Sequence, residues 1–213
     1  MNNEDRIESY IESLIKPMPD YLEEMARFAE EREIPIIRPT MRELMSTLIR
    51  LHRPMTILEI GTAVGFSALY MKEYAPEGCR IVTYENYPPR IEEAKLNFAK
   101  YDKEGCITLM EEDATEAVKR LDGTYDMVFM DGPKGQYINM YDDVKRLLNK
   151  GGLLISDNIL KEGDILESRY AVTRRDRTIH SRMREYVYRL THDEDYQTSV
   201  LSVGDGAAIS VKI

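Results

Sequence analysis

The stretch ILEIGTAVGFS, residues 57–67, joins an apolar run to a helix-like segment through two glycines. Glycine lets the backbone approach a ligand closely, and the free amide groups at the start of a helix favour anionic groups. The glycine spacing is G-x-x-x-G, with Ala63 where a dinucleotide-binding turn has its middle glycine. The stretch therefore predicts a strand, a tight turn and a helix, and the turn is either a ligand-binding turn or a purely structural one.

The chain on both sides of this turn alternates between apolar runs and amphipathic segments. Apolar strands that alternate with helices are typical of a parallel sheet with helices on both faces. The last two runs flank a Gly-Asp-Gly turn, which predicts a hairpin. We expect strands at 55–60, 80–85, 107–111, 125–131, 152–157, 196–203 and 207–213, with helices near 65–75, 88–101, 114–120, 136–148 and 176–190. The prediction is a Rossmann-like α/β fold whose mostly parallel seven-stranded sheet ends in an antiparallel hairpin.

The first 50 residues have helical spacing of apolar residues instead. This spacing predicts helices over 4–16 and 20–33, each ended by prolines. Thr40 and Glu43 have the spacing of a capping box, so we expect a third helix that Thr40 caps. No repeat or long linker interrupts the chain. We therefore expect a single domain over 1–213, with a helical extension over 1–50 and an α/β core over 51–213.

The composition excludes several classes of protein. The chain has 213 residues, 29 of them basic and 38 acidic, which gives a formal net charge of −9, and 43% are apolar. These proportions exclude a charge-dominated disordered chain, and no apolar run approaches the ~18–20 residues that span a membrane. The two cysteines are far apart and the N-terminus is acidic, so we expect a cytoplasmic protein without a disulfide framework. The net charge disfavours indiscriminate nucleic-acid binding but leaves room for a local basic patch.

Polar side chains follow the ends of four expected strands. Glu85 lies about 20 residues after the glycine turn, where a carboxylate can bind ribose hydroxyls, and Asp113 can accept from an exocyclic amine. Asp131 closes the next strand, and Asp157 and Asn158 close the one after it. Two carboxylates and an amide oxygen suit a hard cation such as Mg²⁺ or Ca²⁺, unless these residues simply cap helices. Because parallel strands end at one edge of the sheet, we expect all these side chains to share one crevice.

Together these motifs resemble the metal-dependent O-methyltransferases, a class I methyltransferase family that includes catechol and caffeoyl-coenzyme A O-methyltransferases. The motifs are ILEIGTAVGFSALYM (57–71), YEN (84–86), DA (113–114), DGPK (131–134) and SDN (156–158), and the resemblance covers about 40–213. The helical N-terminus and compact length are most similar to the bacterial tRNA 5-hydroxyuridine methyltransferases. The resemblance implies the class I methyltransferase fold, S-adenosylmethionine (SAM) as methyl donor and Mg²⁺ or another divalent cation.

The resemblance also implies roles for single residues. The positions matched to the cofactor site are Met41, Gly61, Ser67, Glu85, Asp113, Ala114 and Asp131, and those matched to metal ligands are Asp131, Asp157 and Asn158. Lys134 matches the lysine that acts as base in catechol methylation, and together with Asp131 it forms the expected catalytic pair. The alternative for Lys134 is a solvated loop lysine.

The segment 169–184 carries six arginines and one acid on an otherwise acidic chain: Arg169, Arg174, Arg175, Arg177, Arg182 and Arg184. Arginine binds phosphate well, so Arg174, Arg175 and Arg177 are expected to contact RNA. A solvated helix face and a dimer contact are the alternatives.

The resemblance, together with the arginine-rich segment, implies methylation of 5-hydroxyuridine to 5-methoxyuridine at the wobble position of tRNA, with the anticodon region as partner. The alternatives are a small catechol-like phenol as substrate, and a cofactor-binding scaffold without activity, which the intact Asp131 and Asp157 disfavour. By resemblance, we also expect a homodimer.

Overall fold

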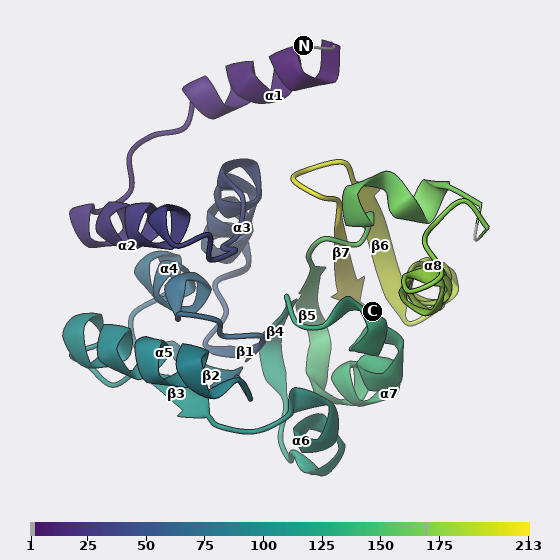
Figure 1. Cartoon of the computed structure of the whole chain (residues 1–213). Helices are drawn as coiled ribbons and strands as arrows, with labels where there is room; N and C mark the ends of the chain where they lie inside the picture. Colours follow the sequence, from purple (N-terminus) through teal and green to yellow (C-terminus); the bar gives the residue numbers. More distant parts are fainter. Residues whose placement is uncertain (1–2, 169) are drawn as a thin grey trace.

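A seven-stranded sheet runs through the centre of the computed structural model, which describes residues 3–168 and 170–213 (Figure 1). Its strands are β1 (Thr56–Ile60), β2 (Arg80–Tyr84), β3 (Ile107–Met110), β4 (Tyr125–Met130), β5 (Leu148–Ser156), β6 (Tyr196–Leu201) and β7 (Ala207–Lys212), in the order β3-β2-β1-β4-β5-β7-β6. The first five are parallel, and β7 is antiparallel to both β5 and β6. The predicted fold class is therefore confirmed, including the antiparallel C-terminal pair.

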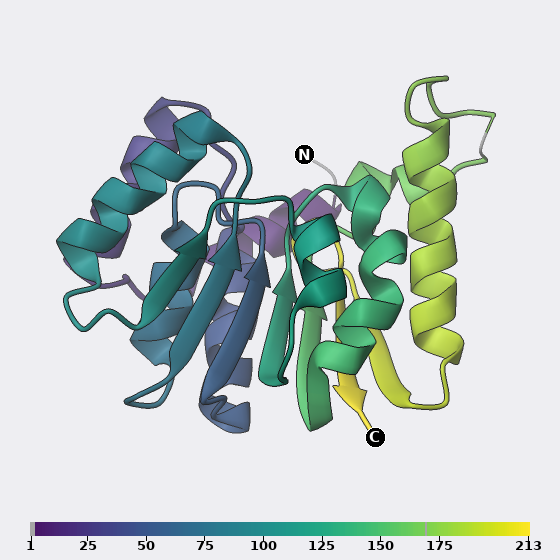
Figure 2. The ribbon, with the colours of Figure 1, turned by 90° about the horizontal axis from the view of Figure 1, so that it is seen from below.

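Helices cover both faces of the sheet (Figure 2). They are α1 (Asn3–Ser13), α2 (Asp20–Glu31), α3 (Pro39–His52), α4 (Phe66–Tyr74), α5 (Pro88–Tyr101), α6 (Ala114–Arg120), α7 (Tyr137–Leu147) and α8 (Arg177–His192), with 3₁₀ turns η1 (Lys134–Gln136) and η2 (Lys161–Leu166). One core lies beneath α2 to α5 and contains Ile57, and the other lies beneath α6 to α8 and contains Leu58. Successive residues of a strand point to opposite faces, so burial of both faces explains why the strand runs are continuously apolar.

The N-terminal segment forms the three predicted helices, but the predicted capping box is wrong. α3 begins at Pro39 with Arg38 at the N-cap position, and no side chain caps it. Proline suits the first helical position because its φ is already helical, so Thr40 falls inside the first turn. Among the residues the structure describes, the Thr40 hydroxyl has no hydrogen-bond partner. α1 contacts α3 and lies at the edge of the molecule in Figure 1.

The order of the strands determines where a ligand can bind. From β1 the chain passes to β2 and β3 on one side of the sheet, and then returns to β4 and β5 on the other. Such a reversal opens a crevice outside the carboxyl ends of the strands, which is where open α/β sheets bind ligands. No helix within the described part of the chain is both long and apolar enough to cross a membrane.

Candidate active site

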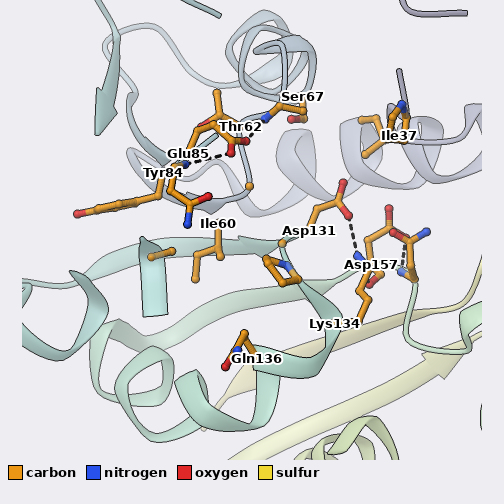
Figure 3. A pocket seen from close by; sticks show the side chains of 18 of the residues that line it. Ile37, Ile60, Thr62, Ser67, Tyr84, Glu85, Asp131, Lys134, Gln136 and Asp157 are labelled. Carbon is orange, nitrogen blue, oxygen red and sulfur yellow. Dashed lines mark hydrogen bonds and ion pairs between the residues drawn. The ribbon is translucent and has the colours of Figure 1, made fainter. Parts of the chain in front are cut away.

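A cavity of about 630 Å³ lies at this crevice. Its walls come from the loops after β1, β2, β4 and β5, from the start of α6, and from residues 35–38 before α3. Figure 3 shows two ends of the cavity. We call the end that holds Gly61, Glu85 and Asp113 the glycine end, and the end that holds Asp131, Lys134, Asp157 and Asn158 the lysine end.

The glycine turn packs directly against the loop after β4. Gly61 has a φ of +102°, and a Cβ there would lie 2.5 Å from the carbonyl oxygen of Asp131. Gly65 has a φ of +82°, and a Cβ there would lie 2.6 Å from the Phe98 ring. Both positions therefore require glycine, for conformation and for space. Ser67, at the start of α4, lines the same end of the cavity.

Backbone amide groups hold the carboxylates of the glycine end. Glu85 Oε2 accepts from the Ala63 amide at 2.9 Å, and Oε1 accepts from the amides of Asn86 and Tyr87 at 3.0 Å each. Asp113 caps α6, because its Oδ1 accepts from the Thr115 amide at 2.8 Å. Glu85, Asp113 and the adjacent Ala114 all line the cavity.

A buried acid beneath the turn, Glu59, was not among the residues predicted from the sequence. It is completely buried, Thr83 Oγ1 donates to its Oε2 at 2.5 Å, and its Oε1 has no hydrogen-bond partner among the described residues. Burial raises the pKa of Glu59 to about 7. The sequence does contain a signal for Glu59, because it places a charged residue within an apolar run. A buried charge is costly, so such a residue points to a special role.

The lysine end gathers the predicted ligands of a cation at neighbouring strand ends. The Asp131 amide donates to the Ile60 carbonyl at 2.9 Å, and the Asp157 amide donates to the Met130 carbonyl at 3.0 Å. These bonds extend the pairing of β1, β4 and β5, and so bring Asp131 and Asp157 to one end of the cavity (Figure 3). Asp157 is 2% exposed, and burial together with the nearby Asp131 raises its pKa to about 6.

These residues fit a hard divalent cation by their chemistry. The trio of proposed ligands comprises two carboxylates, of Asp131 and Asp157, and one amide oxygen, of Asn158. A site made only of His, Cys, Asp and Glu would need three such side chains together, and the described ranges contain no such group. The buried Asp157 carries a desolvation cost that a nearby cation would relieve. The alternative, that the trio caps helices, is wrong, because the N-cap positions of η1, α7 and η2 belong to Pro133, Gln136 and Leu160.

Lys134 is held within the lysine end. Its Nζ donates to Asp131 Oδ1 at 2.8 Å and to the hydroxyl of Tyr137 at 3.0 Å. The side chain is 21% exposed, so it is not a freely solvated loop lysine. Burial raises the pKa of Tyr137 well above its ordinary value, so its hydroxyl keeps its proton.

Met41, expected at the cofactor, is not brought to the cavity. It is completely buried in the core beneath α2 to α5, and it does not line the cavity. Ile36 and Ile37, which precede α3, line the cavity in its place. Met41 follows Pro39 within α3, and its helical position turns it towards the core, so its contact with the cofactor stays a prediction.

The arginine-rich segment divides into exposed and anchored side chains. Arg174 and Arg175 are exposed, whereas Arg177 lies over the Tyr170 ring at 5.7 Å. Arg182 donates to the Gly135 carbonyl at 3.1 Å, and Arg184 donates to the Ile165 carbonyl at 3.0 Å. Arg169 lies outside the described residues. Because Gly135 follows Lys134, Arg182 connects α8 to the lysine end.

Comparisons with known proteins agree with this arrangement. The sequence model of the O-methyltransferase family matches residues 12–213. A catechol O-methyltransferase of Niastella koreensis is 26% identical over 175 residues, which cover 78% of this chain and 79% of that protein. A Staphylococcus aureus structure, provisionally named a caffeoyl-CoA O-methyltransferase, superposes with a TM-score of 0.88 at 31% identity, covering 96% of this chain and 98% of that one.

A Podospora anserina methyltransferase bound to S-adenosylhomocysteine (SAH) superposes with a TM-score of 0.87 at 25% identity, covering 100% of this chain and 97% of that one. SAH is what remains of SAM after methyl transfer. On the family match, the shared fold and the geometry of the cavity, the chain belongs to the O-methyltransferase family and is a SAM-dependent O-methyltransferase of the catechol and caffeoyl-coenzyme A type.

Proposed function

We propose that this enzyme needs a divalent cation, with Mg²⁺ the first choice, and that it methylates 5-hydroxyuridine in tRNA at the wobble position. The observation that carries the cation is the pair of carboxylates at the lysine end, where Asp157 is buried beside Asp131 and Lys134 is the basic side chain in contact. Asp131, Asp157 and Asn158 would hold the cation. When bound, such a cation lowers the pKa of a hydroxyl that it contacts.

The side chains of the cavity then have distinct tasks. SAM would lie at the glycine end, with Glu85 on its ribose, Asp113 and Ala114 at its adenine, and Ser67 near its carboxylate. Lys134, in its uncharged amine form, would take the proton of the acceptor hydroxyl and become an ammonium group beside Asp131. The acceptor oxygen then forms a bond to the methyl carbon as the carbon–sulfur bond breaks, which leaves SAH. Holding the reacting atoms in line contributes up to roughly 7–11 kcal/mol in favourable cases.

A nucleoside can present the paired oxygens that the lysine end would bind, and the lining of the cavity favours it over a small phenol. The 5-hydroxyl and 4-carbonyl oxygens of 5-hydroxyuracil are adjacent, so together they present the same paired oxygens as a catechol. The described aromatic side chains that line the cavity are Phe66 and Tyr84, and both belong to elements of the glycine end. The lysine end therefore lacks the aromatic wall that a small apolar phenol favours.

The exposed arginines support RNA as the carrier of that nucleoside. Arg174 and Arg175 precede α8, and α8 contacts the turn that carries Lys134 through Arg182. Exposed guanidinium groups suit phosphates of an anticodon stem. Their positive charge is a local feature of a chain whose formal net charge is −9.

A small catechol-like phenol is the second candidate, and the names of the relatives favour it. The Niastella koreensis protein is named for catechol, and the Staphylococcus aureus protein is provisionally named for caffeoyl-CoA. Salt separates the candidates, because activity on RNA falls steeply as salt rises whereas activity on a neutral phenol barely responds.

The test is methyl transfer from labelled SAM to tRNA that carries 5-hydroxyuridine, with catechol in parallel, each with and without EDTA. We expect labelled tRNA that is lost with EDTA and restored by Mg²⁺. Label on catechol alone would refute the RNA substrate and keep the cation. Full activity in EDTA, after dialysis against chelator, would refute the cation.

A further inference from the structure

A buried hydroxyl connects the lysine end of the cavity to the strands beneath it. Tyr137 is the first residue of α7, and its side chain is completely buried. Its hydroxyl oxygen lies 2.8 Å from the Met130 carbonyl oxygen, 3.2 Å from the Asp157 carbonyl oxygen and 3.0 Å from Lys134 Nζ. A phenol can donate its one hydrogen to a carbonyl while it accepts one from an amine. This hydroxyl thus joins the ends of β4 and β5 to Lys134.

The contacts of Lys134 show how much depends on this hydroxyl. Besides Asp131 at 2.8 Å and Tyr137 at 3.0 Å, the Nζ approaches the Asp157 carbonyl at 3.4 Å, which is long for a hydrogen bond. Under the proposed function, Asp131 serves as a ligand of the cation. Tyr137 is then the nearest remaining group that fixes the position of the lysine.

We propose that Tyr137 is a positioning residue that keeps Lys134 at the acceptor oxygen during methyl transfer. This inference rests on the proposed role of Lys134 in the reaction. A purely structural role for the hydroxyl would affect stability alone. A positioning role predicts that its removal slows turnover, leaves the binding of SAM and acceptor intact, and has its effect only when Lys134 is present.

The first test is the variant Tyr137→Phe, which removes the hydroxyl and keeps the ring. We expect kcat to fall roughly tenfold, as for the loss of one hydrogen bond, with KM for the acceptor and Kd for SAM within about twofold. Tyr141→Phe is the matched control, because Tyr141 is buried one turn later on α7 and donates to Asp193 at 2.6 Å. It should lower the melting temperature and leave kcat unchanged.

The second test repeats Tyr137→Phe in a Lys134→Ala background, using methyl transfer over long incubations. If Tyr137 acts through Lys134, the double variant is no slower than Lys134→Ala alone. An equal slowing in both backgrounds would overturn the proposal, as would a kcat for Tyr137→Phe within twofold of the wild type.

Crystal structures give a readout that does not depend on activity. Lys134 Nζ should leave its place beside the Asp157 carbonyl in Tyr137→Phe and keep it in Tyr141→Phe, and an unmoved lysine in both would overturn the proposal. The rate assays use whichever acceptor the wild type methylates, 5-hydroxyuridine tRNA or catechol. A wild type that fails on tRNA therefore refutes the proposed substrate without deciding the role of Tyr137.

Discussion

The two ends of the cavity are held in place by different kinds of contact. At the glycine end, three backbone amides fix the Glu85 carboxylate, and helix capping fixes Asp113. At the lysine end, charged side chains face one another, and burial with the nearby Asp131 raises the pKa of Asp157 to about 6. Folding alone therefore prepares the glycine end, whereas under the proposed function the lysine end is completed only when a cation binds. Changes at the two ends should then have separable effects.

The largest expected effect on kcat comes from removing a carboxylate at the lysine end. Asp157→Ala removes a proposed ligand of the cation and should lower kcat roughly a thousandfold, an effect of the size seen when a preorganised electrostatic group is lost from an active site. The Kd for SAM, measured by calorimetry, should stay within about threefold. A variant that keeps a tenth of the wild-type kcat, or one that no longer binds SAM, would contradict the separation of the two ends.

Glu59 is the exception at the glycine end, because it is a buried acid that no backbone amide holds. Its pKa is raised to about 7 in the folded protein, so its contribution to stability is present below its unfolded pKa and is lost as pH rises through about 7. The loss amounts to roughly 3 kcal/mol between pH 4 and 8.

Urea unfolding of the wild type and of Glu59→Gln across this range measures that contribution. The unfolding free energy of the wild type, relative to that of Glu59→Gln, should fall as pH rises from 4 to 8. A constant difference from pH 4 to 8 would show that Glu59 does not titrate in the folded state.

The corresponding substitution at the glycine end is Glu85→Ala. Loss of a charge-assisted hydrogen bond to the cofactor should raise the Kd for SAM about thirtyfold, while kcat at saturating SAM falls no more than threefold. Tryptic peptide patterns with and without SAM provide a check that the glycine turn is still folded. If kcat fell as far as in Asp157→Ala, the two ends would act as one unit.

The smallest effect is expected outside both ends, at the exposed arginines. Arg174→Ala combined with Arg175→Ala should raise KM for tRNA by about threefold to tenfold. The affinity for tRNA should also fall less steeply as salt rises, by the amount expected when about two phosphate contacts are lost. Activity on catechol should not change. Arg53→Ala is a suitable control, because Arg53 is a surface arginine beyond the end of α3, away from the cavity.

Much of the fold was predictable, because it depends on local patterns. Apolar runs and helical spacing located the strands and helices, and parallel strands align their carboxyl ends, so Glu85, Asp113, Asp131 and Asp157 were predicted to meet. Their individual roles in binding remain predictions. The start of α3 was misplaced, because the proline before Thr40 competes with the capping box and determines the first turn.

The features that were missed depend on contacts between distant segments. Tyr137 looked like any aromatic residue at the start of a helix, and only the tertiary structure places its hydroxyl beside Met130 and Asp157. Glu59 belonged to a quoted motif, but its unpaired oxygen follows from packing of neighbouring strands. Arg182 was counted with a charged segment, although its guanidinium binds the Gly135 carbonyl.

The insertion of β7 between β5 and β6 has a consequence for how the enzyme is synthesised. β5 leads into Asp157 and Asn158, and the next two amides, of Ile159 and Leu160, donate to the carbonyls of Gly206 and Asp205. A nascent chain that has emerged only as far as α8 already carries all the motifs between residues 57 and 158. Its β5 edge is still bare, and bare edges recruit foreign strands. The edge of the strand that leads into Asp157 is thus covered only once the last strand of the chain has emerged.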